Sequence, residues 1–170
     1  WEKLDGAMWA ALLSIHPQFA DKCNWDKLDG DGSNWRLLLS KQPQFAKKSD
    51  EFGGWNKMSG ENWPWLLADH PRFVDICASR GMLKNLSGDD WVTILVFGDC
   101  QLDHKCPWEK LNGCDWARLL ASQPQFADRC PWDKFEVEGW ARLISRQPQF
   151  SDSCPWDRFD GKQWVLILLN

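Results

Sequence analysis

WEKLNGCDWARLLASQPQFADRC, residues 108–130, is followed one residue later by WDKFEVEGWARLISRQPQFSDSC at 132–154, and related copies fill the chain. These two copies begin 24 residues apart, and Trp156 opens the next copy after a further 24. A fixed period of this length is typical of solenoids and propellers. The opening position of the pattern holds Trp1, Trp25, Trp55, Trp108, Trp132 and Trp156, with Leu83 in the fourth copy. The sequence therefore predicts a repeat protein.

Each copy predicts a helix, a short second helix and a tight turn. In the first copy Trp9, Leu12 and Leu13 have the spacing of one helix face. Asp5 is the expected N-cap, and Pro17 ends the helix soon after Ile15 and can open the short second helix. Later copies hold Asp31, Ser59, Ser87, Asn112 and Asp160 at the capping position, and only Glu136 is a poor cap. Pro107, Pro131 and Pro155 each predict a 3-10 turn before the next repeat.

One repeat buries too little apolar surface to offset the conformational entropy of ordering it, so the repeats must stack. We predict an all-α solenoid of about seven units in a single repeat domain, 1–170. The predicted repeats are 1–24, 25–54, 55–82, 83–107, 108–131, 132–155 and 156–170, the last one truncated. A β-propeller is disfavoured, because the chain shows little of the alternation and few of the β-branched residues that strands need.

The motif W-x-K-L-D-G-x-x-W-x-x-L-L-x-x-Q-P-Q-F-A-D-K-C resembles that of tryptophan-rich bacterial tandem repeats, and the likeness covers essentially the whole chain. The layout of helix and short turn resembles the α/3-10 solenoids of the leucine-rich-repeat-variant class. The resemblance implies a fold of stacked helical repeats. It implies no activity, cofactor or partner.

Composition narrows the classes of function that the chain can have. A net charge of −4 and a pI of about 5.3 argue against nucleic acid as a partner. We find no apolar run that predicts a membrane span and no signal-peptide pattern. Seven cysteines, an odd number, fit a reducing compartment and favour a cytoplasmic location. We expect neither a cofactor nor a metal site, and no enzyme, because no set of nucleophile, base and orienting residue is recognisable.

Stacking should align equivalent positions of the repeats. The lysine or arginine two residues after the opening position, which we call the basic position, should line a solvated edge. The glutamine that directly precedes the phenylalanine of each repeat should form an amide ladder along the stack. Cysteines at their shared position should be buried thiols, since neighbouring helices stand too far apart for disulfides. The basic position holds Lys3, Lys27, Lys57, Lys110, Lys134 and Arg158. The glutamine ladder consists of Gln18, Gln44, Gln125 and Gln149. The shared cysteine position holds Cys23, Cys77, Cys106, Cys130 and Cys154.

The third and fourth repeats break the pattern, and in solenoids such breaks often mark the binding face. Four-residue insertions within 50–54 and 78–82 should form neighbouring loops that project Phe52, Arg80 and Met82. Trp65 stands where other repeats carry arginine, and the apolar run Trp91–Phe97 needs a cover. That cover is a partner, a second copy of the chain, or an insertion loop folded back.

These features favour a non-catalytic scaffold that binds a protein or peptide through its irregular middle repeats. The candidate binding residues are Phe52, Trp65, Arg80, Met82 and Phe97. The alternative is a structural spacer or self-assembling stalk. Carbohydrate binding by exposed tryptophans is a third hypothesis, weakened because most tryptophans are needed in the core.

Overall fold

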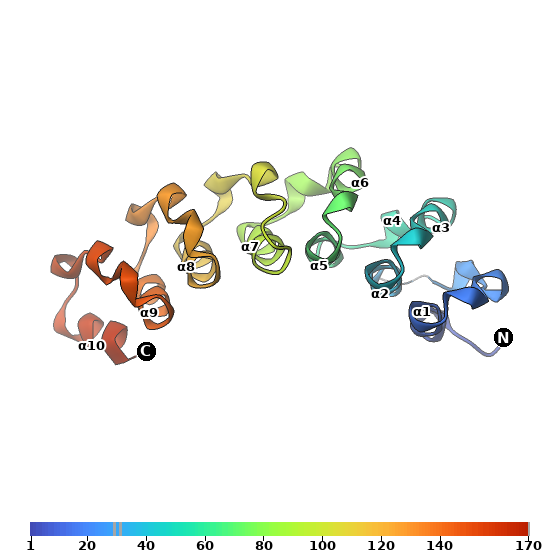
Figure 1. Cartoon of the computed structure of the whole chain (residues 1–170), viewed down its shortest axis with the longest axis horizontal. Coiled ribbons are helices and arrows are strands. Elements are labelled where there is room, and N and C mark those ends of the chain that lie inside the picture. The colour runs from blue at the N-terminus through green and yellow to red at the C-terminus, as the bar shows by residue number, and fades with distance from the viewer. Residues whose placement is uncertain (29, 31, 170) are drawn as a thin grey trace. The chain divides into compact units, whose positions relative to one another are not determined.

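A computed structural model describes residues 1–28, 30 and 32–169, and Figure 1 shows the arrangement of its elements. The described residues form α-helices and 3-10 helices and no strand, so the predicted all-α class is confirmed. Their contacts group them into two compact halves, Trp1–Leu86 and Ser87–Asn170, which we call the N-terminal and C-terminal halves. The boundary falls inside the predicted fourth repeat, immediately before a helix.

In the N-terminal half the long helices are α1 (Gly6–Ile15), α2 (Ser33–Lys41) and α5 (Asn62–Asp69). Figure 1 shows them along one edge of this half, with shorter helices along the other. The shorter α-helices are α3 (Ala46–Glu51), α4 (Gly54–Lys57) and α6 (Val74–Ser79). The 3-10 helices are η1 (Pro17–Lys22), η2 (Trp25–Lys27), η3 (Pro43–Phe45), η4 (Pro71–Phe73) and η5 (Met82–Asn85).

The C-terminal half repeats the same layout more regularly. Its long helices are α7 (Gly88–Phe97), α8 (Gly113–Ser122), α9 (Val137–Arg146) and α10 (Gly161–Leu169). Successive long helices pack against one another, α7 on α8, α8 on α9 and α9 on α10. The 3-10 helices are η6 (Asp103–Lys105), η7 (Trp108–Lys110), η8 (Pro124–Arg129), η9 (Trp132–Lys134), η10 (Pro148–Ser153) and η11 (Trp156–Arg158). The expected helix, short helix and turn are therefore confirmed in these repeats.

Tryptophan pairs recur in the repeats that open with Trp. We call the tryptophan inside each long helix the helix Trp; these residues are Trp9, Trp35, Trp63, Trp91, Trp116, Trp140 and Trp164. The opening Trp of the repeat lies over the helix Trp, as in the pair Trp108 and Trp116, whose ring centroids are 5.4 Å apart. Trp132 and Trp140 pair at the same 5.4 Å spacing. Such repeats thus supply a pair of indoles, whereas the fourth repeat has Leu83 in place of the opening Trp.

Most predicted helix starts are confirmed. The side chains of Asp5, Ser87 and Asn112 accept hydrogen bonds from backbone amides in the first turn, and Asp160 accepts one from the amide of Gln163. Glu136 occupies the N-cap of α9 without a side-chain hydrogen bond, as expected of a poor cap. Asp31 lies outside the described residues.

The predicted cap at Ser59 is wrong. Helix α5 begins at Asn62, and the residues before it form a turn closed by a hydrogen bond from the Asn62 amide to the Ser59 carbonyl. Pro64 has no amide hydrogen to donate to the carbonyl of Gly60, so α5 starts one residue before its helix Trp, whereas α1 and α7 to α10 start three residues before theirs.

The predicted insertion loops are also corrected. Residues 46–51 and 74–79 are α-helical, whereas the equivalent residues of regular repeats stay in a 3-10 helix. Four residues are close to one α-helical turn, so each insertion lengthens the short helix without changing the direction of the chain that follows. The insertions therefore thicken the short-helix edge instead of projecting from it.

Candidate functional site

Trp65 is the candidate anchor that the structure leaves most open in the N-terminal half. It lies two residues after the helix Trp of α5, and 46% of its surface is exposed, whereas Trp63 is fully buried. The same position holds Arg118 and Arg142 in the C-terminal half. An exposed indole at a position that holds arginine in the fifth and sixth repeats is the strongest candidate contact residue in this half.

Phe52 and Met82 do not project as expected, and Arg80, although exposed, is bound within the chain. Phe52 is half-buried and stacks on Trp25, with ring centroids 6.1 Å apart. The Arg80 guanidinium donates to the side chains of Asn56 (2.5 Å) and Asp50 (3.3 Å). Met82 is half-buried at the start of η5. These three residues belong to the short-helix edge, and Trp65 belongs to the long helix α5, so the sequence-predicted patch is divided.

The two insertions are neighbours, as predicted from stacking. Arg80 follows α6, and its partner Asp50 belongs to α3, so the ion pair ties the end of one lengthened short helix to the preceding one. Arg80 therefore serves the fold through contacts within the chain. The sequence predicted that the two insertions are neighbours, but it did not predict that the Asp50 carboxylate binds the Arg80 guanidinium.

Phe97 lies in the last turn of α7, in the C-terminal half, and is 61% exposed. The rest of the apolar run is covered: Trp91, Val92, Ile94 and Leu95 are all buried. Where other repeats continue with Gln-Pro or His-Pro, this one continues with Gly98-Asp99, and Asp99 and Cys100 both have positive φ values (50° and 58°). Left-handed backbone at two successive non-glycine residues is unusual and shows how far this repeat departs from the others.

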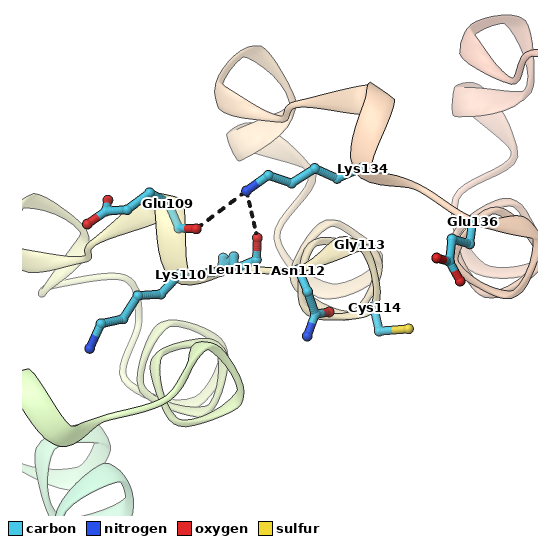
Figure 2. A pocket seen from close by; sticks show the side chains of 8 residues that line it. All are labelled: Glu109, Lys110, Leu111, Asn112, Gly113, Cys114, Lys134 and Glu136. Carbon is cyan, nitrogen blue, oxygen red and sulfur yellow. Dashed lines mark hydrogen bonds between the residues drawn. The ribbon is translucent and has the colours of Figure 1, made fainter.

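Two lysines of the basic position bond to the preceding repeat, a role that the expected solvated edge did not include. The ammonium group of Lys27 donates to the carbonyls of Glu2 and Leu4, both at 2.8 Å. Lys134 does the same to Glu109 (3.4 Å) and Leu111 (3.1 Å), as Figure 2 shows. Each of these two lysines therefore joins its repeat to the turn of the preceding one.

Replacing Lys27 with methionine is expected to lower the free energy of unfolding by about 1–2 kcal/mol, because two hydrogen bonds from a charged donor are lost. Urea denaturation followed by circular dichroism measures the change. Lys3→Met, at the equivalent and exposed position of the first repeat, is the matched control and should change stability little. The acceptors are neutral carbonyls, so the loss should persist in high salt; a loss that disappears there would contradict this role.

The predicted glutamine ladder is corrected too. Gln44, Gln125 and Gln149 donate to the glutamine two residues earlier in their own repeat. Gln125 also donates to the Cys100 sulfur, at the same position of the preceding repeat (3.7 Å), and further bonds along the stack come from the earlier position. There the side chain donates to the last turn of the preceding long helix: Gln42 to the Ser14 carbonyl (2.8 Å) and Gln147 to the Ala121 carbonyl (3.0 Å). His70 contacts the Ser40 carbonyl in the same way (2.9 Å).

The cysteines are free thiols, as predicted from the helix spacing. Cys77, Cys106, Cys130 and Cys154 are buried, and Cys23 is partly exposed. Burial is the largest cause that raises the pKa of Cys77 to about 12, from an ordinary value of 9.0, and it raises that of Cys130 to about 12 as well. At a pH between 9 and 12 these thiols therefore stay protonated in the folded state and are deprotonated in the unfolded state. Their stabilising contribution is complete below pH 9 and is lost as the pH rises toward 12.

A thiol reagent should therefore distinguish Cys114 from the cysteines of the shared position. Cys114 is exposed at the start of α8, and we expect it to react with Ellman's reagent at pH 8 much faster than the buried thiols, which need unfolding to react. Cys23 and Cys100 are partly exposed and should react at intermediate rates. Cys114→Ser should remove one thiol equivalent from the fastest phase, and a fastest phase of unchanged amplitude would contradict the exposure of Cys114.

A cavity of about 460 Å³ lies between the fifth and sixth repeats, within the C-terminal half (Figure 2). Cys114 and Glu136 point toward one another across it. Two of its other polar side chains are used by the fold: Lys134 bonds to backbone carbonyls, and Asn112 caps α8 through reciprocal bonds with Asp115. Burial raises the pKa of the Asp115 carboxyl. The lining also includes Glu109 and Lys110, so the cavity holds one thiol, two glutamates and two lysines.

The described residues hold no cluster of three or more histidine, cysteine or acidic side chains that could bind a metal ion. None of the helices in the described ranges has the length and apolar character needed to cross a membrane. Comparison with known proteins finds no family model, no curated protein and no solved structure that matches the chain. The class of protein that fold and surface define is an all-α protein built of tryptophan-paired helical repeats.

Proposed function

We propose that the chain is a non-catalytic scaffold that binds a protein or peptide, with Trp65 as the anchor of the binding surface. The observation that carries the proposal is the exposure of this indole, 46%, on a helix whose own core tryptophan is fully buried. Tryptophan is among the residues that contribute most to binding when a partner covers it.

The surface beside Trp65 supports an apolar contact. Its position, two residues after the helix Trp, is occupied by Ala11 and Leu37 on the neighbouring long helices α1 and α2. Side chains at this position can touch along the stack, since in the C-terminal half Arg118 donates to Thr93 at 2.8 Å. Ala11, Leu37 and Trp65 therefore define an apolar stripe, which suits the hydrophobic face of a bound segment.

Phe97 supplies a second exposed aromatic side chain, on the C-terminal half. Phe52 and Met82 are half-buried in the short-helix elements and not in the long helix that carries Trp65, so they are proposed to stabilise the fold. Arg80 is engaged with Asp50 and Asn56, so the proposal gives it no direct part in recognition.

Selection from a displayed peptide library tests the proposal. The chain should select peptides with aromatic or aliphatic anchors, and Trp65→Arg should weaken their binding at least tenfold, about 1.4 kcal/mol. Arginine is the residue that the fifth and sixth repeats carry at this position, so the substitution suits the helix. Arg80→Ala, on the other edge, is the control and should bind normally.

Two results would oppose the proposal. Equal binding by wild type and Trp65→Arg would remove Trp65 from the binding surface. A library that yields no specific peptide would favour the alternative, a structural spacer, in which the exposed indole binds no ligand.

A further inference from the structure

Two arginines on helix α9 have no partner within the described part of the chain. Arg142 and Arg146 are both exposed, and neither guanidinium makes a hydrogen bond or an ion pair there. They lie four residues apart, so both project from the same side of the helix, about one turn from each other. Like charges at this spacing disfavour a helix, so placing them together does not serve the helix itself.

The equivalent arginine of the preceding long helix is engaged within the fold. Arg118, on α8, donates to the carboxylate and the backbone carbonyl of Asp89 and to the hydroxyl of Thr93, both on α7. Asp89 lies two residues before the helix Trp of α7, and Thr93 lies two residues after it. An arginine two residues after the helix Trp can therefore reach these two positions of the preceding long helix.

The residues at those two positions of α8 explain why Arg142 lacks a partner. They are Cys114 and Arg118, a thiol and a second guanidinium. A guanidinium accepts no hydrogen bond, and a thiol accepts only a weak one. The sixth repeat thus has the arginine of this position, and the fifth repeat lacks the carboxylate that would bind it.

A groove of about 480 Å³ lies between α9 and α10, which pack side by side in the C-terminal half (Figure 1). The two lining positions that carry arginine also face solvent in the internal helix α5, where Trp65 and Asp69 hold them. The groove therefore belongs to a junction between two adjacent repeats and not to an end of the chain. Its lining consists of Glu138, Ala141, Arg142, Ser145 and Arg146 from α9 and Leu166 from α10.

The groove combines two cations with an apolar side chain from the other helix. Leu166 is 41% exposed, and the hydroxyl of Ser145 donates to the Arg142 carbonyl at 3.0 Å, so the guanidiniums supply the charged donors. A guanidinium binds a carboxylate through two parallel hydrogen bonds. The groove thus suits a ligand that presents carboxylates next to an apolar side chain.

Glu138 places one carboxylate in the same groove, four residues before Arg142 and eight before Arg146. Eight residues are about 12 Å along a helix, so this carboxylate lies toward the opposite end of the groove from Arg146. An anion at the Arg146 end therefore meets two positive charges first, and Glu138 weakens its binding only from a distance.

We propose that the groove between α9 and α10 binds an acidic segment of a partner protein. A carboxylate of that segment is held by Arg142 and Arg146, and an apolar side chain packs on Leu166. Charge complementarity decides the occupant, because two cations without partners gather here in a chain whose net charge is −4. Nucleic acid is disfavoured, since the lining has no aromatic ring for a base to stack on and includes a carboxylate. This second site lies on the C-terminal half and does not depend on Trp65.

Fluorescence anisotropy of labelled peptides tests the proposal. The probe is a short peptide in which glutamates flank leucine, and the reference peptide has glutamine at every glutamate position. The acidic peptide should bind at least about tenfold more tightly than the reference, and its affinity should fall as salt is added. Arg142→Gln and Arg146→Gln should each weaken binding of the acidic peptide at least about fivefold, because each removes a charged donor.

Lys105→Gln is the matched control. It removes one positive charge from an exposed side chain of η6, in the C-terminal half but outside the groove, and should bind the acidic peptide like wild type. Glu138→Gln removes the carboxylate of the groove and should strengthen binding about twofold or more, a gain that a misfolded chain could not show. Circular dichroism should give the same helix content for every variant, since each changed side chain is exposed.

Four results would overturn the proposal. Absence of binding by the acidic peptide at low salt would remove the site, and equal binding of the two peptides would show that carboxylates are not recognised. Equal losses in Lys105→Gln and Arg142→Gln would mean that only the overall charge of the chain matters. A single-stranded oligonucleotide that binds more tightly than the acidic peptide, and loses affinity in Arg142→Gln, would identify a nucleic-acid site instead.

Discussion

Trp116→Ala is expected to lower the free energy of unfolding by about 3–5 kcal/mol, the cost of removing a fully buried aromatic side chain from a core that cannot close the space. Trp116 has no exposed surface and stacks on Trp108 at 5.4 Å. Its helix α8 packs on both α7 and α9. In a repeat protein each repeat is stabilised by its neighbours, so the loss should spread to the adjoining repeats. Urea denaturation measured by far-ultraviolet circular dichroism gives the change.

Two other substitutions distinguish the effect of burial on stability from the effect of residue type. Trp65→Ala removes the same side chain from a half-exposed position and should cost much less than Trp116→Ala. Trp116→Phe should fall between wild type and Trp116→Ala, because the buried indole nitrogen makes no hydrogen bond within the described residues and only volume is lost. Equal losses for Trp65→Ala and Trp116→Ala would contradict the aromatic-pair core.

Local chemistry made much of the fold predictable from the sequence. The caps at Asp5, Ser87 and Asn112 depend on one side chain and the amide three residues later, so neighbouring residues contain all the necessary information. The same local rule failed at Ser59, where Pro64 removes a backbone donor from the first turn. Ser59 and Pro64 are both visible in the sequence, and the prediction was wrong because it considered the capping residue and not the proline.

The insertions could not be placed by the same reasoning. A sequence shows that four residues are added after Ser49 and after Cys77, but it does not show whether they extend a helix or leave it. The structure continues the short helix by about one turn, and the added residues then contact one another through Arg80 and Asp50. That outcome depends on packing between repeats, which a local pattern does not specify.

The functional positions show the same difference between local and long-range information. The exposure of Trp65 follows from comparing equivalent positions, since arginine in two other repeats marks that side of the helix as solvent-facing. The roles of Lys27 and Gln42 were missed because their acceptors are backbone carbonyls more than twenty residues away. Backbone acceptors carry no residue signature, so no pattern of side chains could have revealed them.

Gly113→Ala is expected to destabilise the chain by about 1–3 kcal/mol, the usual cost of forcing an extra atom into a closely packed contact. A Cβ atom on Gly113 would overlap the carbonyl of Lys134 and lie 3.3 Å from the Cα of Phe135. Both are backbone atoms, so they can give way only if the fifth and sixth repeats separate. That separation would also pull the ammonium group of Lys134 away from Leu111, 3.1 Å from it.

Gly161→Ala is the matched control, because Gly161 occupies the same position in α10 and nothing among the described residues lies within 4 Å of its added Cβ. In the isolated monomer this change should be neutral or slightly stabilising, since alanine favours a helix over glycine by up to about 1 kcal/mol. Val137 stands at this position in the sixth repeat, so the need for glycine belongs to particular junctions and is not a property of the position itself. Thermal unfolding of the two variants should move the midpoint in opposite directions or move that of Gly113→Ala alone. A Gly113→Ala chain as stable as wild type would show that the repeats do not approach one another through this carbonyl.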